Sequence, residues 1–111
     1  MIRIYATKRG EKYRLLVQGH AEKEGEGKLV CAAVSALTGA LVGFARACTA
    51  CKYVRSSLSH GNVFLSCYFG LQDAFFMTLL ALQQLADAYP MHLCVCGREG
   101  VVNDSQYACV L

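Results

Sequence analysis

The chain has 111 residues, of which 55% are hydrophobic and 17% charged, and it contains seven cysteines and a single proline. This length and apolar content predict one folded domain whose core needs neither disulfides nor a metal, and they exclude a disordered chain. The formal net charge of +3 is too small to attract polyanions over the whole surface. The sequence is still compatible with a local basic patch near the N-terminus. The first residues include Arg3, Lys8, Arg9, Lys12 and Arg14.

The first residues lack the basic stretch, long apolar run and small-residue cleavage site of a secretory signal. We therefore expect a cytoplasmic protein in which the odd number of cysteines stays reduced. The uncharged run from Leu29 to Ala45 is slightly short for a membrane span and contains polar and glycine residues. It predicts a buried core helix and no membrane association.

A hairpin and a long helix are predicted in the first half of the chain. Apolar and polar residues alternate over 2–7 and 13–18 around a charged turn, which is typical of two paired strands. Residues 21–28 are acidic and glycine-bearing, which predicts a mobile loop. Over residues 29–51 the apolar side chains recur at three- and four-residue spacing, which predicts a helix.

A second hairpin, a second helix and a short last strand are predicted in the second half of the chain. Residues 52–59 and 63–69 are rich in β-branched and aromatic types and flank a His-Gly-Asn turn, which predicts a second hairpin. Residues 72–89 return to helical spacing and end before Pro90, and residues 91–96 form a short apolar strand.

The predicted order ββαββαβ, with hairpins in place of regular βαβ units, indicates an α+β fold. Two helices then cover one largely antiparallel sheet within a single domain. We place this domain at residues 1–97 and a C-terminal tail of weak strand character at residues 98–111.

The candidate catalytic pair is His20, at the end of a predicted strand, and Cys31, in the first turn of the predicted helix. The helix dipole, the free amides at the helix start and the nearby Lys28 all favour a thiolate. A thiolate is a nucleophile, an imidazole can act as general base and acid, and helix-start amides can bind an oxyanion. On these residues alone, a buried helix cysteine without a catalytic role is the more common occurrence.

Two segments of the chain resemble a known family. Gly19-His20-Ala21, the glycine-containing loop and the segment 29–37 (LVCAAVSAL) are similar to the ribosomal-processing cysteine protease family, Prp. The resemblance extends more loosely to Gly61-Asn62-Val63 and to residues 82–90, and it covers residues 1–96.

The resemblance implies roles for individual residues. His20 and Cys31 correspond to the catalytic dyad of the family, and Ser35 corresponds to a serine of the same motif, one helical turn after the cysteine. Family members usually carry an aspartate where this chain has Lys28. The change removes a natural helix cap and reverses a charge beside the nucleophile, and it bears on substrate preference.

The function implied by the resemblance is that of a homodimeric, cytoplasmic endopeptidase. It removes the N-terminal extension of a large-subunit ribosomal protein precursor, cutting after a short motif that ends in aromatic residues. No cofactor and no metal are needed for this chemistry.

The acidic loop gives a further hypothesis about substrate binding. Its three glutamates attract a basic substrate segment while Gly25 and Gly27 let the loop close over that segment. A solvated hinge is the alternative interpretation. The glutamates are Glu22, Glu24 and Glu26.

Other functions stay open at this point. A non-catalytic ribosome-associated or assembly protein with the same fold would fit the unusual Lys28. A zinc-binding adaptor would use four cysteines, although neither pair lies on a turn that directs both sulfurs at one ion. These are Cys48, Cys51, Cys94 and Cys96.

A dedicated nucleic-acid-binding module is not expected. The basic first hairpin with Tyr5 and Tyr13 matches no recognised RNA-binding motif, and the overall charge is low. His60, in a turn, and His92, on a strand, are interpreted as surface or edge residues and not as ligands.

Overall fold

Five strands and two helices make up the computed structural model, which describes residues 1–22 and 24–99. Their order is ββαββαβ, as predicted. The elements are β1 (Ile2–Arg9), β2 (Lys12–Gln18), α1 (Glu26–Ala47), β3 (Lys52–Ser59), β4 (Asn62–Tyr68), α2 (Gln72–Ala88) and β5 (Leu93–Glu99).

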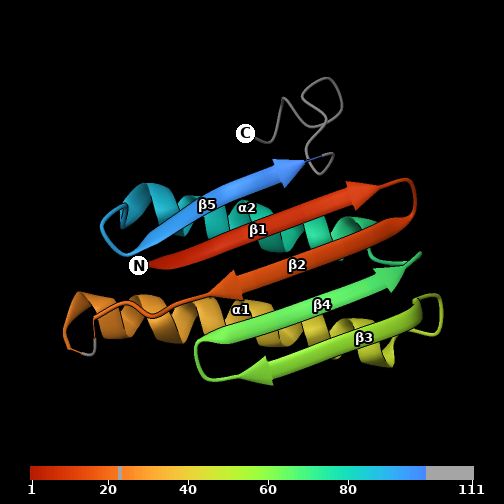
Figure 1. The fold of residues 1–111 in the computed structure, drawn as a ribbon, viewed down its shortest axis with the longest axis horizontal. Coiled ribbons are helices and arrows are strands. Elements are labelled where there is room, and N and C mark those ends of the chain that lie inside the picture. Colours follow the sequence, from red (N-terminus) through yellow and green to blue (C-terminus); the bar gives the residue numbers. More distant parts are fainter. Residues whose placement is uncertain (23, 100–111) are drawn as a thin grey trace.

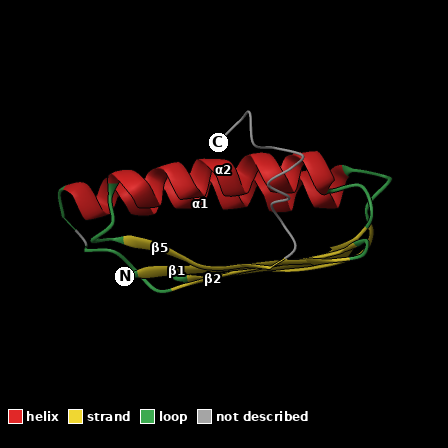
Figure 2. Ribbon diagram, turned by 90° about the horizontal axis from the view of Figure 1, so that it is seen from above, coloured by secondary structure: helices red, strands yellow, loops and turns green. Residues whose placement is uncertain are grey.

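All strands belong to one sheet with the order β3-β4-β2-β1-β5 (Figure 1). The hairpins β1–β2 and β3–β4 are antiparallel and join through the antiparallel pair β2–β4, whereas β5 runs parallel to β1. Both helices lie on the same face of the sheet (Figure 2). The predicted α+β fold, with two helices on a largely antiparallel sheet, is therefore confirmed.

The core fills the space between the sheet and the helices. Ile4, Leu15 and Leu65 lie on three neighbouring strands, and each is fully buried. Tyr13 of β2 and Phe75 of α2 meet edge to face with ring centroids 5.3 Å apart. Burying a leucine or phenylalanine stabilises the fold by about 1.5–3 kcal/mol, so these contacts hold α2 and the central strands together.

Helix α1 is long and apolar enough to cross a membrane when judged by length and composition alone. Its buried residues, however, form one stripe that includes Val30, Val34, Leu41 and Ala45, at the spacing of a single helical face. That stripe packs into the core with the sheet residues. The structure thus favours the predicted core helix.

The ends of α1 differ from the prediction of residues 29–51. The helix begins at Glu26, because Gly27 has no Cβ and so its backbone can lie against that of Glu22. It ends at Ala47, because Cys48 is extended and the following turn reverses the chain into β3. The predicted loop is accordingly shorter at its C-terminal end, since Glu26, Gly27 and Lys28 are helical.

Both hairpins are tighter than predicted. Their loops contain only the pairs Gly10-Glu11 and His60-Gly61, so the strands extend further on either side. In each loop the glycine has a positive φ, 59° for Gly10 and 77° for Gly61, a backbone conformation that favours glycine.

The last strand also extends beyond its predicted end. β5 runs to Glu99, so it includes the first two residues of the segment 98–111 that was assigned to a tail. The remainder of that predicted tail lies outside the described residues.

The four cysteines of the zinc hypothesis do not come together. Cys48 and Cys51 lie in the turn that leads from α1 into β3, whereas Cys94 and Cys96 lie on β5. These two strands are at opposite edges of the sheet. The zinc-binding alternative is therefore wrong, because four ligands of one tetrahedral ion must lie within a few ångströms of each other.

Candidate active site

The candidate site forms where the end of β2, the β3–β4 turn and helix α1 meet. Backbone contacts fix His20 at this point, just after β2. The Gly19 N–H donates to the Gly61 carbonyl oxygen at 2.9 Å, and the Met1 ammonium donates to the His20 carbonyl oxygen at 2.7 Å. The imidazole therefore projects from a backbone that is held on two sides.

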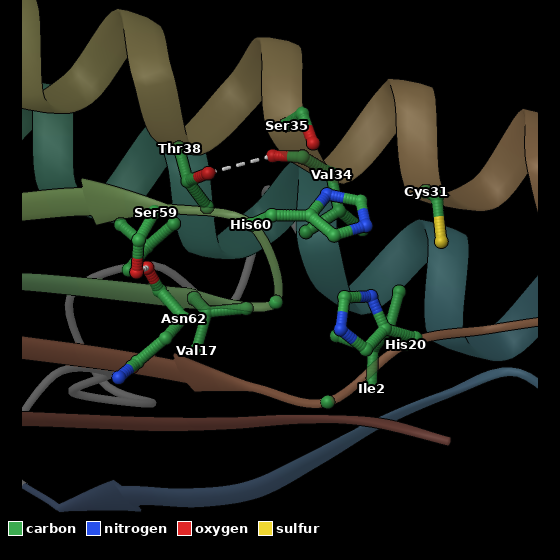
Figure 3. Close-up of a pocket in the computed structure, with 13 residues that line it drawn as sticks. Ile2, Val17, His20, Cys31, Val34, Ser35, Thr38, Ser59, His60 and Asn62 are labelled. Atoms are coloured by element: carbon green, nitrogen blue, oxygen red, sulfur yellow. Dashed lines mark hydrogen bonds between the residues drawn. The ribbon is translucent and has the colours of Figure 1, made fainter.

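Cys31 lies on the face of α1 that looks toward this corner. Its half-buried sulfur accepts a hydrogen bond from the Ala21 backbone N–H at 3.3 Å. Figure 3 shows the sulfur projecting from the helix on the side where the His20 ring lies. Cys31 and His20 line the same open pocket of about 490 Å³, so the structure brings the predicted pair together.

The surroundings of the sulfur differ from the prediction in one respect. Cys31 is in the second turn of α1 and not in its first, because the helix begins at Glu26. The free amides of the helix start consequently belong to the preceding turn. The Ala21 amide, which the sequence analysis did not single out, is the backbone donor that contacts the sulfur.

Lys28 has a different structural role from the one inferred. It is the third residue of α1, and the N-cap is Gly25, which makes no side-chain capping bond. The absence of an aspartate at Lys28 thus removes no cap. The reversed charge remains part of the site, since Lys28 lines the same pocket as Cys31.

The sequence analysis missed His60, which it interpreted as a surface residue of a turn. The His20 and His60 rings lie 4.5 Å apart between centroids, tilted by 41°, and both line the pocket (Figure 3). The cause is the β2–β4 register, in which Gln18 pairs with Asn62. His20 lies two residues beyond Gln18, and His60 lies two residues before Asn62, so both histidines lie at the same end of the ladder.

The five predicted substrate-binding residues occupy different places. Glu22 and Lys28 line the 490 Å³ pocket. Ser35 lines a narrower hollow of about 90 Å³ beside it, which also contains Cys31 and both histidines. Two of the five lie outside these pockets: Glu24 and Glu26.

The Glu26 carboxylate has a partner of its own. Its Oε2 lies 3.1 Å from Nε2 of His92, the residue just before β5. His92 lies in the turn before the edge strand β5 and not on a strand as predicted, and this contact ties the start of α1 to the start of β5. Gly27 lies in α1, with its backbone against that of Glu22. Of the two glycines that were expected to let the loop close, only Gly25 therefore lies outside the helix.

The other cysteines are poorer nucleophiles or lie elsewhere. Burial raises the pKa of the Cys51 thiol to about 12 and also raises the pKa of Cys67, so both stay protonated at neutral pH. A hydrogen bond from the Ala50 backbone lowers the pKa of Cys48, but Cys48 is outside the pocket. Among the described residues, no group of three or more His, Cys, Asp or Glu side chains could hold a metal ion.

Comparison with solved structures shows the same fold in other proteins. The ribosomal processing protease Prp from Staphylococcus aureus, in complex with a substrate peptide, has a TM-score of 0.69 at 19% identity. The alignment covers 87% of this chain and 99% of that one. The same protease with a covalently linked product peptide has a TM-score of 0.69 at 20% identity and equal coverage.

A protein from Streptococcus mutans has a TM-score of 0.67 at 22% identity, covering 89% of this chain and 95% of that one. No curated protein matches the sequence. Residues 1–93 match the family of the cysteine protease Prp. A thiol and an imidazole that share one pocket belong to the chemistry of cysteine hydrolases. The chain belongs to the cysteine protease Prp family, and it is a cysteine protease.

The close approach of Gly61 to His20 yields a first prediction. A Cβ on Gly61 would collide with the His20 imidazole, whereas a Cβ on Gly10 would meet no atom within 4 Å. Because both glycines have positive φ, Gly61→Ala and Gly10→Ala strain the backbone to a similar extent. We expect only Gly61→Ala to lower kcat/KM for peptide hydrolysis, by about 100-fold, since it displaces the imidazole.

The two variants should show similar losses of stability in urea, so unfolding cannot account for a difference in rate. Equal activities of Gly61→Ala and Gly10→Ala would contradict this role of the glycine.

Proposed function

We propose that this chain is an endopeptidase that removes the N-terminal extension of a large-subunit ribosomal protein precursor, with Cys31 as nucleophile and His20 as general base and acid. The observation that carries the proposal is the shared pocket of these two side chains, with the Ala21 amide bonded to the sulfur. No cofactor enters the mechanism.

The first half of the reaction forms a thioester. His20 takes the proton of the Cys31 thiol, and the sulfur attacks the carbonyl carbon of the scissile peptide bond. The Ala21 N–H, 3.3 Å from the sulfur, stabilises the thiolate before the attack. The tetrahedral intermediate collapses as the C–N bond breaks, and His20 gives its proton to the leaving amine.

The second half restores the enzyme. Water enters the open pocket, His20 takes one of its protons, and the oxygen attacks the thioester carbonyl carbon. The C–S bond breaks, the proton on His20 passes to the sulfur, and the product leaves as a carboxylic acid that then gives its proton to solvent. His60, which packs against His20, limits the rotation of the His20 ring and keeps it directed into the pocket.

The substrate class follows from the relatives. Family membership and the Staphylococcus aureus structures with substrate and product peptides support a ribosomal protein as the substrate. We keep the cut after a motif that ends in aromatic residues as what the family resemblance implies. Such a reaction takes place in the cytoplasm, where ribosomal proteins are made. We place Glu22, Lys28 and Ser35 against the peptide, because they line the pockets around Cys31.

The dyad is tested by single substitutions with matched controls. Cys31→Ala and His20→Ala should each lower the cleavage rate of a peptide that copies the extended N-terminus by at least about 100-fold. Cys96→Ala and His92→Ala change the same residue types away from the pocket and should retain the rate. Cleavage by Cys31→Ala or His20→Ala at the wild-type rate, measured by mass spectrometry, refutes the assignment.

Substrate capture by the acidic loop gives another prediction. Glu22 lines the pocket, whereas the Glu26 carboxylate faces His92. Glu22→Gln should therefore raise KM for a basic peptide about threefold at low salt, with kcat unchanged, and Glu26→Gln should not. The difference should shrink at 0.5 M salt, because screening weakens an exposed charge pair. A KM that Glu22→Gln leaves unaltered at low salt removes the loop charge from capture.

The homodimer implied by the family is assigned here to the outward face of α1. Leu29 and Phe44 are 68% and 45% exposed on this helix, and Ala32, Ala36 and Gly43 between them are also exposed. Small residues let two helices approach closely, and no charge interrupts residues 29–45. Sedimentation equilibrium should give a dimer for the wild type and a monomer for Ala36→Arg; a dimer that survives this substitution contradicts the assignment.

A further inference from the structure

The sheet has a second face, opposite the helices (Figure 2). Its side chains alternate with those of the core, so their places follow from the strand register. Thr7 pairs with Arg14, and Arg14 pairs with Ser66, which in turn pairs with Arg55. These residues form one row across four strands, and the neighbouring rows are built in the same way.

This open face is basic. Six of the residues that the register places on it are cations, whereas one, Glu99 opposite Thr7, is acidic. The cations come from strands β1, β2 and β3, and the exposed Arg55 lies far in sequence from those of β1 and β2. They are Arg3, Arg9, Lys12, Arg14, Lys52 and Arg55.

Aromatic rings stand between these cations. The Lys12 ammonium lies 5.6 Å from the centre of the Tyr68 ring, and the Arg14 guanidinium lies 5.7 Å from that of Phe64. Tyr53 meets Tyr68 edge to face at 5.8 Å. On the other side of Arg14, the ring of Tyr5 is 40% exposed on β1.

The face also contains a hollow of suitable chemistry for a phosphate group. Its volume is about 170 Å³, and Thr7, Arg9, Lys12 and Arg14 line it. Three cationic side chains and one hydroxyl thus surround a single depression, with the Tyr68 and Phe64 rings beside two of the cations. Cationic grooves flanked by exposed rings are the arrangement that binds the backbone and bases of single strands.

We propose that the open face of the sheet binds single-stranded nucleic acid, with a backbone phosphate in the Arg9–Lys12–Arg14 hollow and bases stacked on the neighbouring rings. A second copy of this chain is a poor occupant, because two identical faces that are both rich in cations repel one another. A phosphodiester backbone supplies the opposite charge, and the rings supply contacts that no phosphate alone can use. This inference stands apart from the proteolytic site, and it replaces the expectation that the chain has no dedicated nucleic-acid surface.

The test measures fluorescence anisotropy of a labelled single-stranded 12-nucleotide RNA over a range of salt concentrations. The Cys31→Ala protein is the background, so the result does not depend on peptide cleavage. Lys12→Ser combined with Arg14→Ser should weaken binding about tenfold or more. Since each lost phosphate contact lowers the slope of log K against log salt by about 0.7 for single strands, the pair should lower it by about 1.4.

The matched control is Lys28→Ser combined with Arg46→Ser, which removes two charges from α1. We expect a change of no more than about twofold, because these charges lie across the helix layer and are screened. Tyr68→Leu should weaken binding about fivefold or more without changing the salt slope, since stacking does not release counterions. Circular dichroism and thermal unfolding of every variant establish that it is folded.

Four outcomes overturn the proposal. The first is that the folded Cys31→Ala protein, whose open face is unchanged, gives no rise in anisotropy at low salt. The second is an equal loss of affinity for the Lys12/Arg14 and Lys28/Arg46 variants, which reduces binding to net charge. The third is a dimer in sedimentation that is lost only in the Lys12/Arg14 variant, because the open face then forms the interface with a second copy of the chain. Equal affinity for a 12-base-pair duplex likewise overturns it, since paired bases cannot stack on the rings.

Discussion

The pairing of β2 with β4 is the constraint on which the rest of the structure depends. It joins two hairpins that are otherwise local structures, and its register fixes Gln18 opposite Asn62. A shift by one residue would turn every side chain of a strand to the other face. The buried Leu15 and Leu65, which pair directly, prevent such a shift because each would then leave the core.

The same register builds the candidate active site. His20 and the β3–β4 turn become neighbours only because both lie just beyond the last pair of the β2–β4 ladder. Gly61 must lack a Cβ for the His20 ring to fit beside it. The candidate site is thus a product of sheet pairing, to which α1 adds the sulfur.

Much of this could be predicted from the sequence. Alternating residues predicted the first hairpin, β-branched and aromatic residues around a His-Gly-Asn turn predicted the second, and the spacing of Val30, Val34 and Leu41 predicted a helix. The pair of His20 and Cys31 was found because a short motif carries both. These features are local, so a single stretch of sequence contains the information for each of them.

The features that the sequence analysis missed depend on contacts between distant segments. His60 could not be placed beside His20, since that requires the register between two hairpins. The early start of α1 depends on the contact of Gly27 with the Glu22 backbone, whereas glycine in isolation indicates a loop. The sequence allowed a basic patch in the first hairpin, but not its extension to Arg55, because β3 joins the first hairpin only through β4 in the assembled sheet.

The contact of Gly27 with Glu22 also determines how the protease meets its peptide. Because the Glu22 backbone rests on the helix that carries the Cys31 sulfur, the wall of the pocket and the proposed nucleophile form one preassembled unit. Little conformational entropy then remains for the protein to lose when a peptide binds, and most of that entropic cost falls on the peptide itself. A peptide already constrained to its bound shape, such as a cyclic one, should therefore be a better starting point for an inhibitor than a flexible one.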